Sequence, residues 1–189
     1  MKTDKFYKKA LFLDRDGIIN EDFGYVYESN KFKLVDGIIE LIAYFTSIVD
    51  HIIVISNQSG IGRGFYTHRD WENFNKQIEK VLMSRSLKID AFYCCPHLPK
   101  SLTGEECICR KPNPGMLLLA KNDFSINLKK SILVGDKISD IQAAHCAGLL
   151  KAYLLTKKKI KSNKFDDFNF RIVKSLKEII KIENINLIG

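Results

Sequence analysis

Short apolar runs alternate along the chain with longer stretches that have helical periodicity. Five runs rich in β-branched and aliphatic residues are predicted as strands, at residues 10–14, 51–56, 89–94, 131–136 and 151–155. Because these runs are apolar at almost every position, we expect them to be buried on both faces of a parallel sheet. A further run at residues 170–173 is predicted to form an edge strand.

Between these runs, apolar residues recur at the spacing of an amphipathic helix. Helices are predicted over residues 36–50, 67–85, 115–124, 138–148 and 175–182. Thr67 begins a capping box with Asp70. Asn113 and Ser175 are typical helix N-caps, and Gly148 is typical of a helix end. Strands that alternate with helices in this way predict a doubly wound, Rossmann-like α/β fold.

Length and composition are those of an ordinary globular protein. The 189 residues can form one substantial core, so we expect a single domain over residues 1–189. No apolar run approaches the roughly 20 residues of a membrane-spanning helix. The basic N-terminus is followed by too short an apolar stretch for a secretory signal. We therefore expect a cytoplasmic protein without a membrane partner.

The formal charge of +8 is compatible with nucleic acid, an anionic membrane surface or small anionic substrates. Much of the excess lies in residues 156–164 (TKKKIKSNK), which contain no aromatic residue on which a base could stack. This composition is typical of a solvated connection. We therefore predict no nucleic-acid partner and favour a small anionic substrate.

Polar side chains stand at the ends of three predicted strands. Asp14, Ser56 and Asp136 are the residues concerned. In an open parallel sheet, ligands bind beyond the carboxyl ends of the strands, so we expect these side chains to converge on one crevice. Asp16 lies two residues beyond Asp14, and Gly17 permits a sharp turn that brings both carboxylates to one pocket. Alone, this D-x-D-G sequence is more typical of a turn, and three further stretches decide otherwise.

These stretches carry groups suited to phosphoryl chemistry. Residues 54–64 (VISNQSGIGRG) form a glycine-rich loop in which backbone N–H groups and the Ser56 hydroxyl can donate to phosphoryl oxygens. Lys111, in CRKPNPGM at residues 109–116, can neutralise charge on a transferring phosphoryl group. Asp136 and Asp140 are hard oxygen ligands of the kind that binds Mg²⁺ together with a substrate phosphate.

A loop over residues 94–111 holds four of the five cysteines. Cys107 and Cys109, with His97 and either Cys94 or Cys95, offer four ligands at a spacing that suits tetrahedral structural zinc. An odd number of clustered cysteines does not suit a disulfide framework. The fifth, Cys146, lies on an Ala-rich predicted helix and is expected in the core.

Taken in order, these motifs resemble those of the haloacid dehalogenase superfamily: D-x-D-G, a strand-terminal serine, a lysine and G-D-x-x-x-D, spread over about residues 10 to 155. The resemblance implies a phosphatase without a large cap domain that works through an aspartyl-phosphate. Asp14 would attack phosphorus, and Asp16 would protonate the leaving alcohol and later activate water. Ser56 and Lys111 would stabilise the phosphoryl oxygens.

The same resemblance implies two metals. Catalytic Mg²⁺ would be held by Asp14, Asp136 and the backbone carbonyl of Asp16, and Asp140 would orient this site. The Cys-Pro-His sequence at residues 95–97 matches the superfamily members that carry a zinc loop, which selects Cys95 over Cys94. The implied zinc ligands are Cys95, His97, Cys107 and Cys109, and Cys94 is then expected to be a small core residue.

The zinc loop makes the chain similar to the superfamily's heptose-bisphosphate phosphatases and to the neighbouring histidinol-phosphate phosphatases. Residues 22–26, 57–64 and 109–116 favour the heptose branch. That branch implies removal of the 7-phosphate from D-glycero-D-manno-heptose 1,7-bisphosphate during synthesis of nucleotide-activated heptose; a histidinol-phosphate or other small sugar-phosphate phosphatase is the alternative. The implied substrate-binding residues are Asp22, Phe23, Gly24, Tyr25, Asn57, Gln58, Ser59, Arg63, Arg110 and Lys137. One departure is Ile18, where the family usually has threonine.

Two other classes of function explain less. A zinc-clip nucleic-acid binder predicts a cationic helix after the clip, whereas residues 115–124 are mostly apolar. A disulfide-exchange protein needs C-x-x-C at a helix start, whereas C-C and C-x-C occur here. Neither class requires Asp14, Asp16 and Asp136. With no heptad pattern or large apolar stripe, we expect a monomer.

Overall fold

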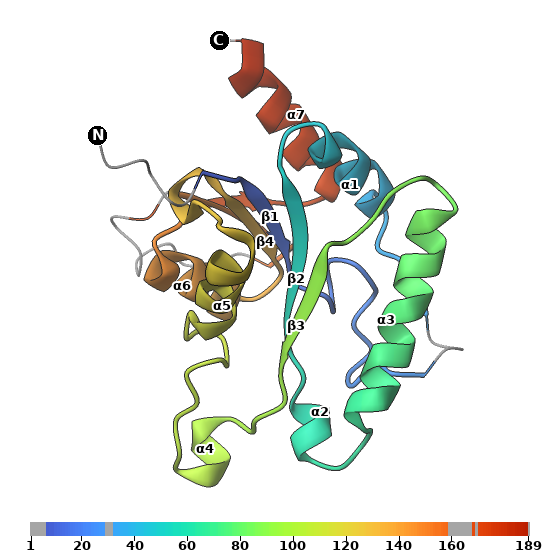
Figure 1. Ribbon diagram of the computed structural model, residues 1–189, viewed down its shortest axis with the longest axis vertical. Coiled ribbons are helices and arrows are strands. Elements are labelled where there is room, and N and C mark those ends of the chain that lie inside the picture. Colours follow the sequence, from blue (N-terminus) through green and yellow to red (C-terminus); the bar gives the residue numbers. More distant parts are fainter. Residues whose placement is uncertain (1–6, 29–31, 159–167, 169, 189) are drawn as a thin grey trace.

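The computed structural model describes residues 7–28, 32–158, 168 and 170–188, and its centre is a parallel sheet. Among these residues the sheet has six strands in the order β3-β2-β1-β4-β5-β6 (Figure 1). The strands are β1 (Ala10–Leu13), β2 (His51–Asn57), β3 (Ala91–Cys95), β4 (Ile132–Gly135), β5 (Lys151–Leu155) and β6 (Phe170–Val173). Each neighbouring pair is parallel. The predicted sheet, including its edge strand at β6, is confirmed. The expectation that residues 89–94 are buried on both faces is wrong, because β3 forms the other edge and four of its five residues are only partly buried.

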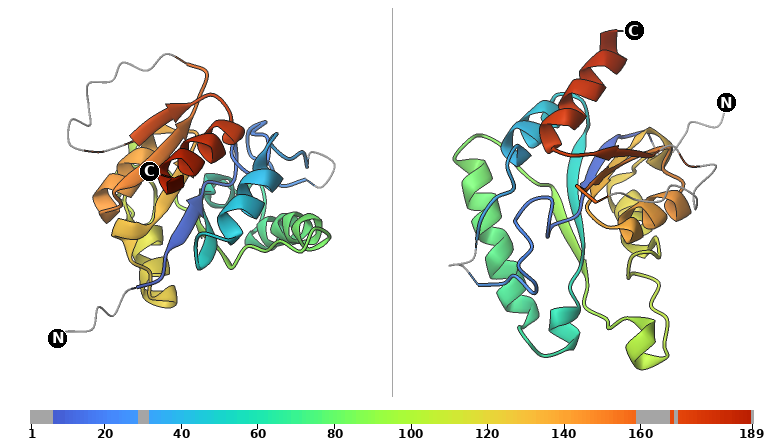
Figure 2. Two further views of the ribbon diagram at one scale, coloured as in Figure 1. Left: turned by 90° about the horizontal axis from the view of Figure 1, so that it is seen from above. Right: turned by 180° about the vertical axis from the view of Figure 1, so that it is seen from behind.

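Helices cover both faces of this sheet, as Figure 2 shows from two directions. One face packs against α1 (Ile38–Thr46), α3 (His68–Met83) and α7 (Leu176–Ile188), and the other against α5 (Gly115–Phe124) and α6 (Ile138–Ala147). Short helices α2 (Ser59–Gly62), α4 (Lys100–Thr103) and η2 (Leu128–Lys130) lie in connections. None of the described helices is long and apolar enough to cross a membrane.

The two cores follow from the alternation of side chains along each strand. In β1, Leu11 and Leu13 join the core under α1, α3 and α7, whereas Ala10 and Phe12 join the core under α5 and α6. All four are completely buried. A strand buried on both faces needs an apolar residue at every position, and the sequence of β1 is therefore a continuous apolar run.

Most predicted helix ends are observed. Thr67 and Asp70 form a capping box at the start of α3, and Gly148 ends α6 in the left-handed conformation with φ 82°. Ser175 Oγ accepts the N–H of Glu178, 3.3 Å away, at the start of α7. The predicted cap Asn113 is wrong. Its Nδ2 donates to the carbonyl of Cys107 at 2.8 Å, and α5 starts after Pro114 without a side-chain cap.

The strand order creates a switch point beside β1, because the chain proceeds from β1 to β2 on one side and later returns to β4 on the other. Such a switch point opens a crevice beyond the carboxyl ends of the strands, where ligands bind in open α/β sheets. Asp14 directly follows β1, and Asp136 directly follows β4. Of the basic connection predicted over residues 156–164, residues 159–164 lie outside the described part of the chain.

Candidate active site

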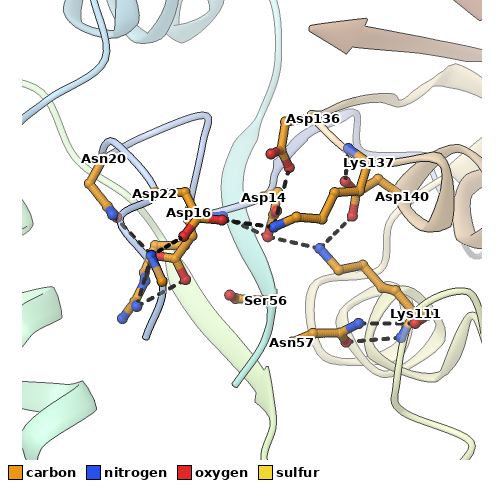
Figure 3. Close-up of polar contacts among 12 residues, drawn as sticks. Asp14, Asp16, Asn20, Asp22, Ser56, Asn57, Lys111, Asp136, Lys137 and Asp140 are labelled. Atoms are coloured by element: carbon orange, nitrogen blue, oxygen red, sulfur yellow. Dashed lines mark hydrogen bonds and ion pairs between the residues drawn. The ribbon is translucent and has the colours of Figure 1, made fainter. Parts of the chain in front are cut away.

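Three carboxylates meet beyond the ends of β1 and β4. Asp14, Asp136 and Asp140 each offer an oxygen within 4.8 Å of the others (Figure 3). The Asp14 N–H donates to the carbonyl of Val134 at 3.0 Å, which extends the β1–β4 pairing to the first acid. Asp140 comes from the first turn of α6, where its Oδ2 accepts the N–H of Lys137 at 3.0 Å. The sheet therefore brings together acids that are far apart in sequence.

Lys111 supplies a cation to this cluster. Its Nζ lies 2.8 Å from Asp14 Oδ1 and 2.6 Å from Asp140 Oδ1, and it also donates to the carbonyl of Ile55 at 2.9 Å. The backbone of Lys111 is clamped by Asn57, whose Nδ2 donates to its carbonyl at 2.9 Å and whose Oδ1 accepts its N–H at 3.0 Å. Asn57, predicted to bind substrate, thus uses both ends of its amide to position Lys111 at the end of β2.

The electrostatics of the cluster reflect burial and crowding. Burial raises the pKa of Asp14 above its usual range, although the nearby Lys111 ammonium opposes this shift. Burial and the neighbouring Asp14 raise the pKa of Asp136 to about 7. Burial alone would lower the pKa of Lys111, but Asp14 and Asp140 outweigh it and raise that pKa. The site therefore holds more carboxylates than its cation compensates.

The excess of carboxylates fits a divalent cation. Asp136 Oδ1 is buried without a hydrogen-bond partner among the described residues, and it lies 3.8 Å from the Lys137 ammonium. Crowded carboxylate oxygens are the ligands that Mg²⁺ takes, usually with water and a substrate phosphate completing its shell. Gly17 permits the close approach, because it has φ 93° and a Cβ there would lie 2.5 Å from Asp136 Oδ2. The donor set therefore suits magnesium.

Asp16 lies apart from the cluster, at the mouth of the crevice. Its carboxylate accepts hydrogen bonds from the guanidinium of Arg15, from Asn20 Nδ2 at 2.9 Å and from Gln58 Nε2 at 2.8 Å. The same Gln58 Nε2 donates to the Oγ of Ser56, which is almost completely buried at the end of β2. Gln58 thereby links a carboxyl group to a hydroxyl group that can face a phosphate.

A pocket of about 420 Å³ opens beside these groups. It is lined by Asp16, Asp22, Gly24, Tyr25, Asn57, Gln58, Ser59, Tyr66, Arg110, Lys111, Lys137 and Ser139. Asp22 and Lys137 pair across it, with 3.1 Å between Oδ2 and Nζ. Of the ten residues predicted to bind substrate, eight line this pocket, whereas Phe23 and Arg63 do not. Lys111, Arg110 and Lys137 give the pocket a cationic side.

Sequence reasoning passed over Arg15, Asn20 and Tyr66 at this site. Arg15 and Asn20 are completely buried and bond to Asp16, and Tyr66 donates its hydroxyl proton to Gln58 Oε1. The one local signal was an arginine between the two acids of the D-x-D-G motif. Only the path of the loop after β1 places that arginine in the interior.

The four predicted zinc ligands come together on the loop after β3. Cys95 Sγ, His97 Nδ1, Cys107 Sγ and Cys109 Sγ lie within 4.8 Å of one another, with Cys107 and Cys109 2.9 Å apart. Three thiols and one imidazole nitrogen around a common centre are a donor set for tetrahedral zinc. Arg110, directly after Cys109, donates from Nη1 to the carbonyl of His97 at 3.1 Å, which ties this cluster to the cationic side of the pocket.

The other two cysteines differ from expectation. Cys94 was expected to be a small core residue, but it is only half-buried, with its Sγ 3.7 Å from His68 Nε2. Cys146 was expected in the core, but it is exposed. Cys95, by contrast, is completely buried, and its Sγ lies 3.5 Å from His97 Nδ1 within the four-residue cluster.

Known proteins similar to this chain include heptose bisphosphate phosphatases. The family model for polynucleotide kinase 3 phosphatase matches residues 12–177. The D-glycero-alpha-D-manno-heptose-1,7-bisphosphate 7-phosphatase of Campylobacter jejuni subsp. jejuni serotype O:2 is 44% identical over 172 residues, which cover 91% of this chain and 94% of that protein. The D-glycero-beta-D-manno-heptose-1,7-bisphosphate 7-phosphatase of Escherichia coli (strain K12) is 41% identical over 143 residues, which cover 74% of this chain and 75% of that protein.

A solved structure agrees with these relatives. The D,D-heptose 1,7-bisphosphate phosphatase from B. bronchiseptica, complexed with magnesium and phosphate, superimposes with a TM-score of 0.78 at 25% identity, covering 94% of this chain and 99% of that one. Sequence and fold therefore point to the same group of enzymes. The chain belongs to the polynucleotide kinase 3 phosphatase family within the haloacid dehalogenase superfamily, and it is a phosphoric monoester hydrolase.

Proposed function

We propose that this phosphatase removes the 7-phosphate of D-glycero-D-manno-heptose 1,7-bisphosphate through an aspartyl-phosphate on Asp14. The observation that carries the proposal is the contact of Lys111 with Asp14 and Asp140 beside Asp136, at the switch point of the sheet. The names of the relatives from Campylobacter jejuni and Escherichia coli support this substrate class.

The first step transfers the phosphoryl group to Asp14. A carboxylate oxygen of Asp14 bonds to phosphorus while the bond from phosphorus to the sugar oxygen breaks, and Asp16 gives its proton to that departing oxygen. Lys111, Ser56 and the backbone N–H groups of the following loop stabilise the charge on the phosphoryl oxygens. In the second step Asp16 takes a proton from water, which attacks phosphorus and releases phosphate and free Asp14.

Magnesium would be held by Asp14, Asp136 and the carbonyl of Asp16, and when bound it supplies positive charge to the phosphoryl oxygens. Asp140 keeps two roles in this arrangement. Its Oδ1 faces Lys111, and its Oδ2 holds the first turn of α6, so it orients the residues around the ion. Zinc in the cluster of Cys95, His97, Cys107 and Cys109 would be structural, because four protein ligands leave no open position.

A bisphosphate substrate is supported by the charge of the pocket. Lys111 lies deep in it, whereas Arg110 and Lys137 line its outer part and can meet a second phosphate. A second dianion needs cations of its own, and guanidinium suits phosphate by its paired donors. A substrate with one phosphate leaves part of this cationic side unused, so the pocket supports the heptose bisphosphate over histidinol phosphate.

Phosphate release from a panel of substrates tests the proposal. The panel holds the alpha and beta anomers of the heptose 1,7-bisphosphate, histidinol phosphate and fructose 1,6-bisphosphate, assayed with Mg²⁺. We expect the highest kcat/KM on one of the heptose anomers, with the 1-phosphate left in place. Faster cleavage of histidinol phosphate would replace the proposed substrate with its alternative. Asp14→Asn should abolish turnover without unfolding the protein, and activity within about tenfold of the parent would contradict the covalent mechanism.

A further inference from the structure

Arg15, between the two acids of the D-x-D-G motif, is completely buried. Its Nη2 lies 3.0 Å from each carboxylate oxygen of Asp16, and its Nε lies 3.2 Å from Oδ1. The guanidinium carbon also lies 4.9 Å from the centre of the Phe74 ring, on helix α3. A buried guanidinium is costly unless a carboxylate compensates its charge, and Asp16 is the one that contacts it among the described residues.

Other contacts hold this arginine in one orientation. Its Nη2 donates to the carbonyl of Val26 at 2.7 Å and approaches Gln58 Oε1 at 3.3 Å. The hydroxyl of Tyr66 donates to the same Oε1, which leaves the Nε2 of Gln58 turned toward Asp16 and Ser56. Arg15, Tyr66 and Gln58 therefore form a connected network with Asp16 at its end. Tyr66 is nearly buried as well, so the network is shielded from water.

Proton transfer depends on this kind of constraint. Asp16 lies on the loop after β1, outside any regular helix or strand that would fix the direction of its side chain. A general acid must lie within hydrogen-bonding distance of the oxygen that it protonates, and small displacements greatly reduce the rate. The guanidinium and the amide meet the carboxyl group from two sides and keep it at the pocket.

We propose that Arg15 is a positioning residue for proton transfer, acting with Gln58 and Tyr66 to hold the Asp16 carboxyl group toward the leaving oxygen of the substrate. The inference rests on the proposed role of Asp16 as general acid. Arg15 is completely buried and is not among the residues that line the pocket, so it would act through Asp16. Its effect should therefore depend on how much the leaving group needs a proton.

Two substrates separate this role from a structural one. The sugar oxygen of a heptose bisphosphate leaves as a basic alkoxide and needs a proton, whereas the oxygen of 4-nitrophenyl phosphate leaves as a stable anion. The ratio kcat/KM reports the steps up to leaving-group departure, so it excludes the later hydrolysis of the aspartyl-phosphate. We expect Arg15→Lys, which keeps the charge but loses the planar fork, to lower kcat/KM about tenfold more for the heptose bisphosphate than for 4-nitrophenyl phosphate.

A second variant guards against misfolding. Tyr66→Phe removes one hydroxyl that fixes the Gln58 amide, and we expect the same selective loss, about threefold, with an unchanged circular dichroism spectrum. If both substrates lose equally in both variants, or neither loses, Arg15 has only a structural role and the inference is wrong. If the substrate panel shows that another sugar phosphate is hydrolysed faster than the heptose bisphosphate, that sugar phosphate is used in these assays instead.

Asp16→Asn distinguishes failure of this inference from failure of the proposed function. Loss of the acid should lower kcat/KM for the sugar phosphate about 100-fold more than for 4-nitrophenyl phosphate. If Asp16→Asn shows no such difference, Asp16 is not the general acid and the proposed function fails at that step. If Asp16→Asn loses more kcat/KM on the sugar phosphate than on 4-nitrophenyl phosphate and Arg15→Lys does not, only the positioning role of Arg15 is overturned.

Discussion

The Nζ of Lys111 lies 2.8 Å from Oδ1 of Asp14, although 97 residues separate the two along the chain. Both side chains are almost completely buried, and the same ammonium contacts Asp140 at 2.6 Å. Buried charges are stable only in contact with groups of opposite charge, because each would otherwise be an uncompensated ion in a medium of low dielectric. The contact therefore couples the stability of the fold to the arrangement of the candidate active site.

Lys111→Met should lower both stability and activity. Removal of the ammonium leaves Asp14 and Asp140 buried without their common partner, which should reduce the free energy of unfolding by about 3 kcal/mol. Urea denaturation of the metal-free protein measures this loss. The double variant with Asp140→Asn should recover part of it, because one uncompensated carboxylate is then gone. An unchanged urea midpoint in Lys111→Met would contradict the coupling, and phosphatase activity should fall about 100-fold or more.

Asp136 should make the metal-free protein less stable as the pH rises. Its pKa is about 7 in the folded protein, against 3.8 for the unfolded group, so the folded state binds the extra proton between these values. The contribution of the neutral carboxyl group to stability is therefore lost as the pH rises toward 7. We expect a decrease of about 2 kcal/mol between pH 5.5 and 7.5 in EDTA. Asp136→Asn should flatten this profile, and the same slope in that variant would exclude Asp136 as its source.

Gly17→Ala should impair magnesium binding more than it impairs folding. The new Cβ would lie 2.5 Å from Asp136 Oδ2 and force that carboxylate away from Asp14. Gly148→Ala is the matched control, because Gly148 also has positive φ but meets nothing within 4 Å. Both variants should lose about 1 kcal/mol of stability from backbone strain. Only Gly17→Ala should need much more Mg²⁺ for half-maximal activity, and equal requirements in the two variants would refute the steric argument.

The cysteine loop should contain one equivalent of zinc when the protein is prepared without chelator. Elemental analysis is the measurement, and Cys107→Ala should lose the metal because three ligands remain. The control Cys146→Ala removes an exposed thiol on α6 and should keep the zinc. Brief EDTA treatment followed by Mg²⁺ alone should restore activity, since thiolate-bound zinc exchanges slowly. Only trace zinc in the parent protein would show that this loop is not a zinc site.

Arg110→Ala should affect recognition of a bisphosphate more than the chemical step. Arg110 lines the pocket and is tied to the cluster of Cys95, His97, Cys107 and Cys109 through the carbonyl of His97. Loss of one charge-assisted contact should lower kcat/KM for the heptose bisphosphate by about 2 kcal/mol, chiefly through KM. A simple monophosphate ester such as 4-nitrophenyl phosphate should change much less. Equal losses on both substrates would mean that Arg110 acts on the phosphoryl group being transferred.

The strands were predictable because burial on both faces demands continuous apolar runs, and the observed strands lie within about two residues of the predicted ones. The predicted helix over residues 36–50 is shorter, as α1 begins after Gly37 in the left-handed conformation. Asn113 shows a limit of local reasoning. Its Nδ2 donates to the carbonyl of Cys107 in the cysteine loop, and no side chain caps α5.

The candidate active site was likewise predictable only in part. Residue type and order along the chain were enough to predict that Asp14, Ser56 and Asp136 would converge, since parallel strands present their carboxyl ends on one edge. Lys111 follows no strand, and it was expected at the site from the resemblance. Phe23 and Arg63 were expected at the pocket from the resemblance to the heptose branch, and neither is among the residues that line it. Loops outside the sheet have no such periodicity, so sequence spacing does not say which way their side chains turn.

The sequence alone was therefore enough for the fold class, the acids at the strand ends and three of the cysteine-loop ligands, His97, Cys107 and Cys109. The fold class and the acids follow from apolar patterning with one rule about parallel sheets, and the three ligands follow from their spacing. The resemblance to a known family was needed to select Cys95 over Cys94. The packing of the folded chain was needed to show that Arg15 is buried against Asp16, that Asn57 clamps Lys111 and that Tyr66 orients Gln58. These contacts join segments whose approach depends on the packing of the whole core, because a buried polar group takes the partner that folding brings within reach.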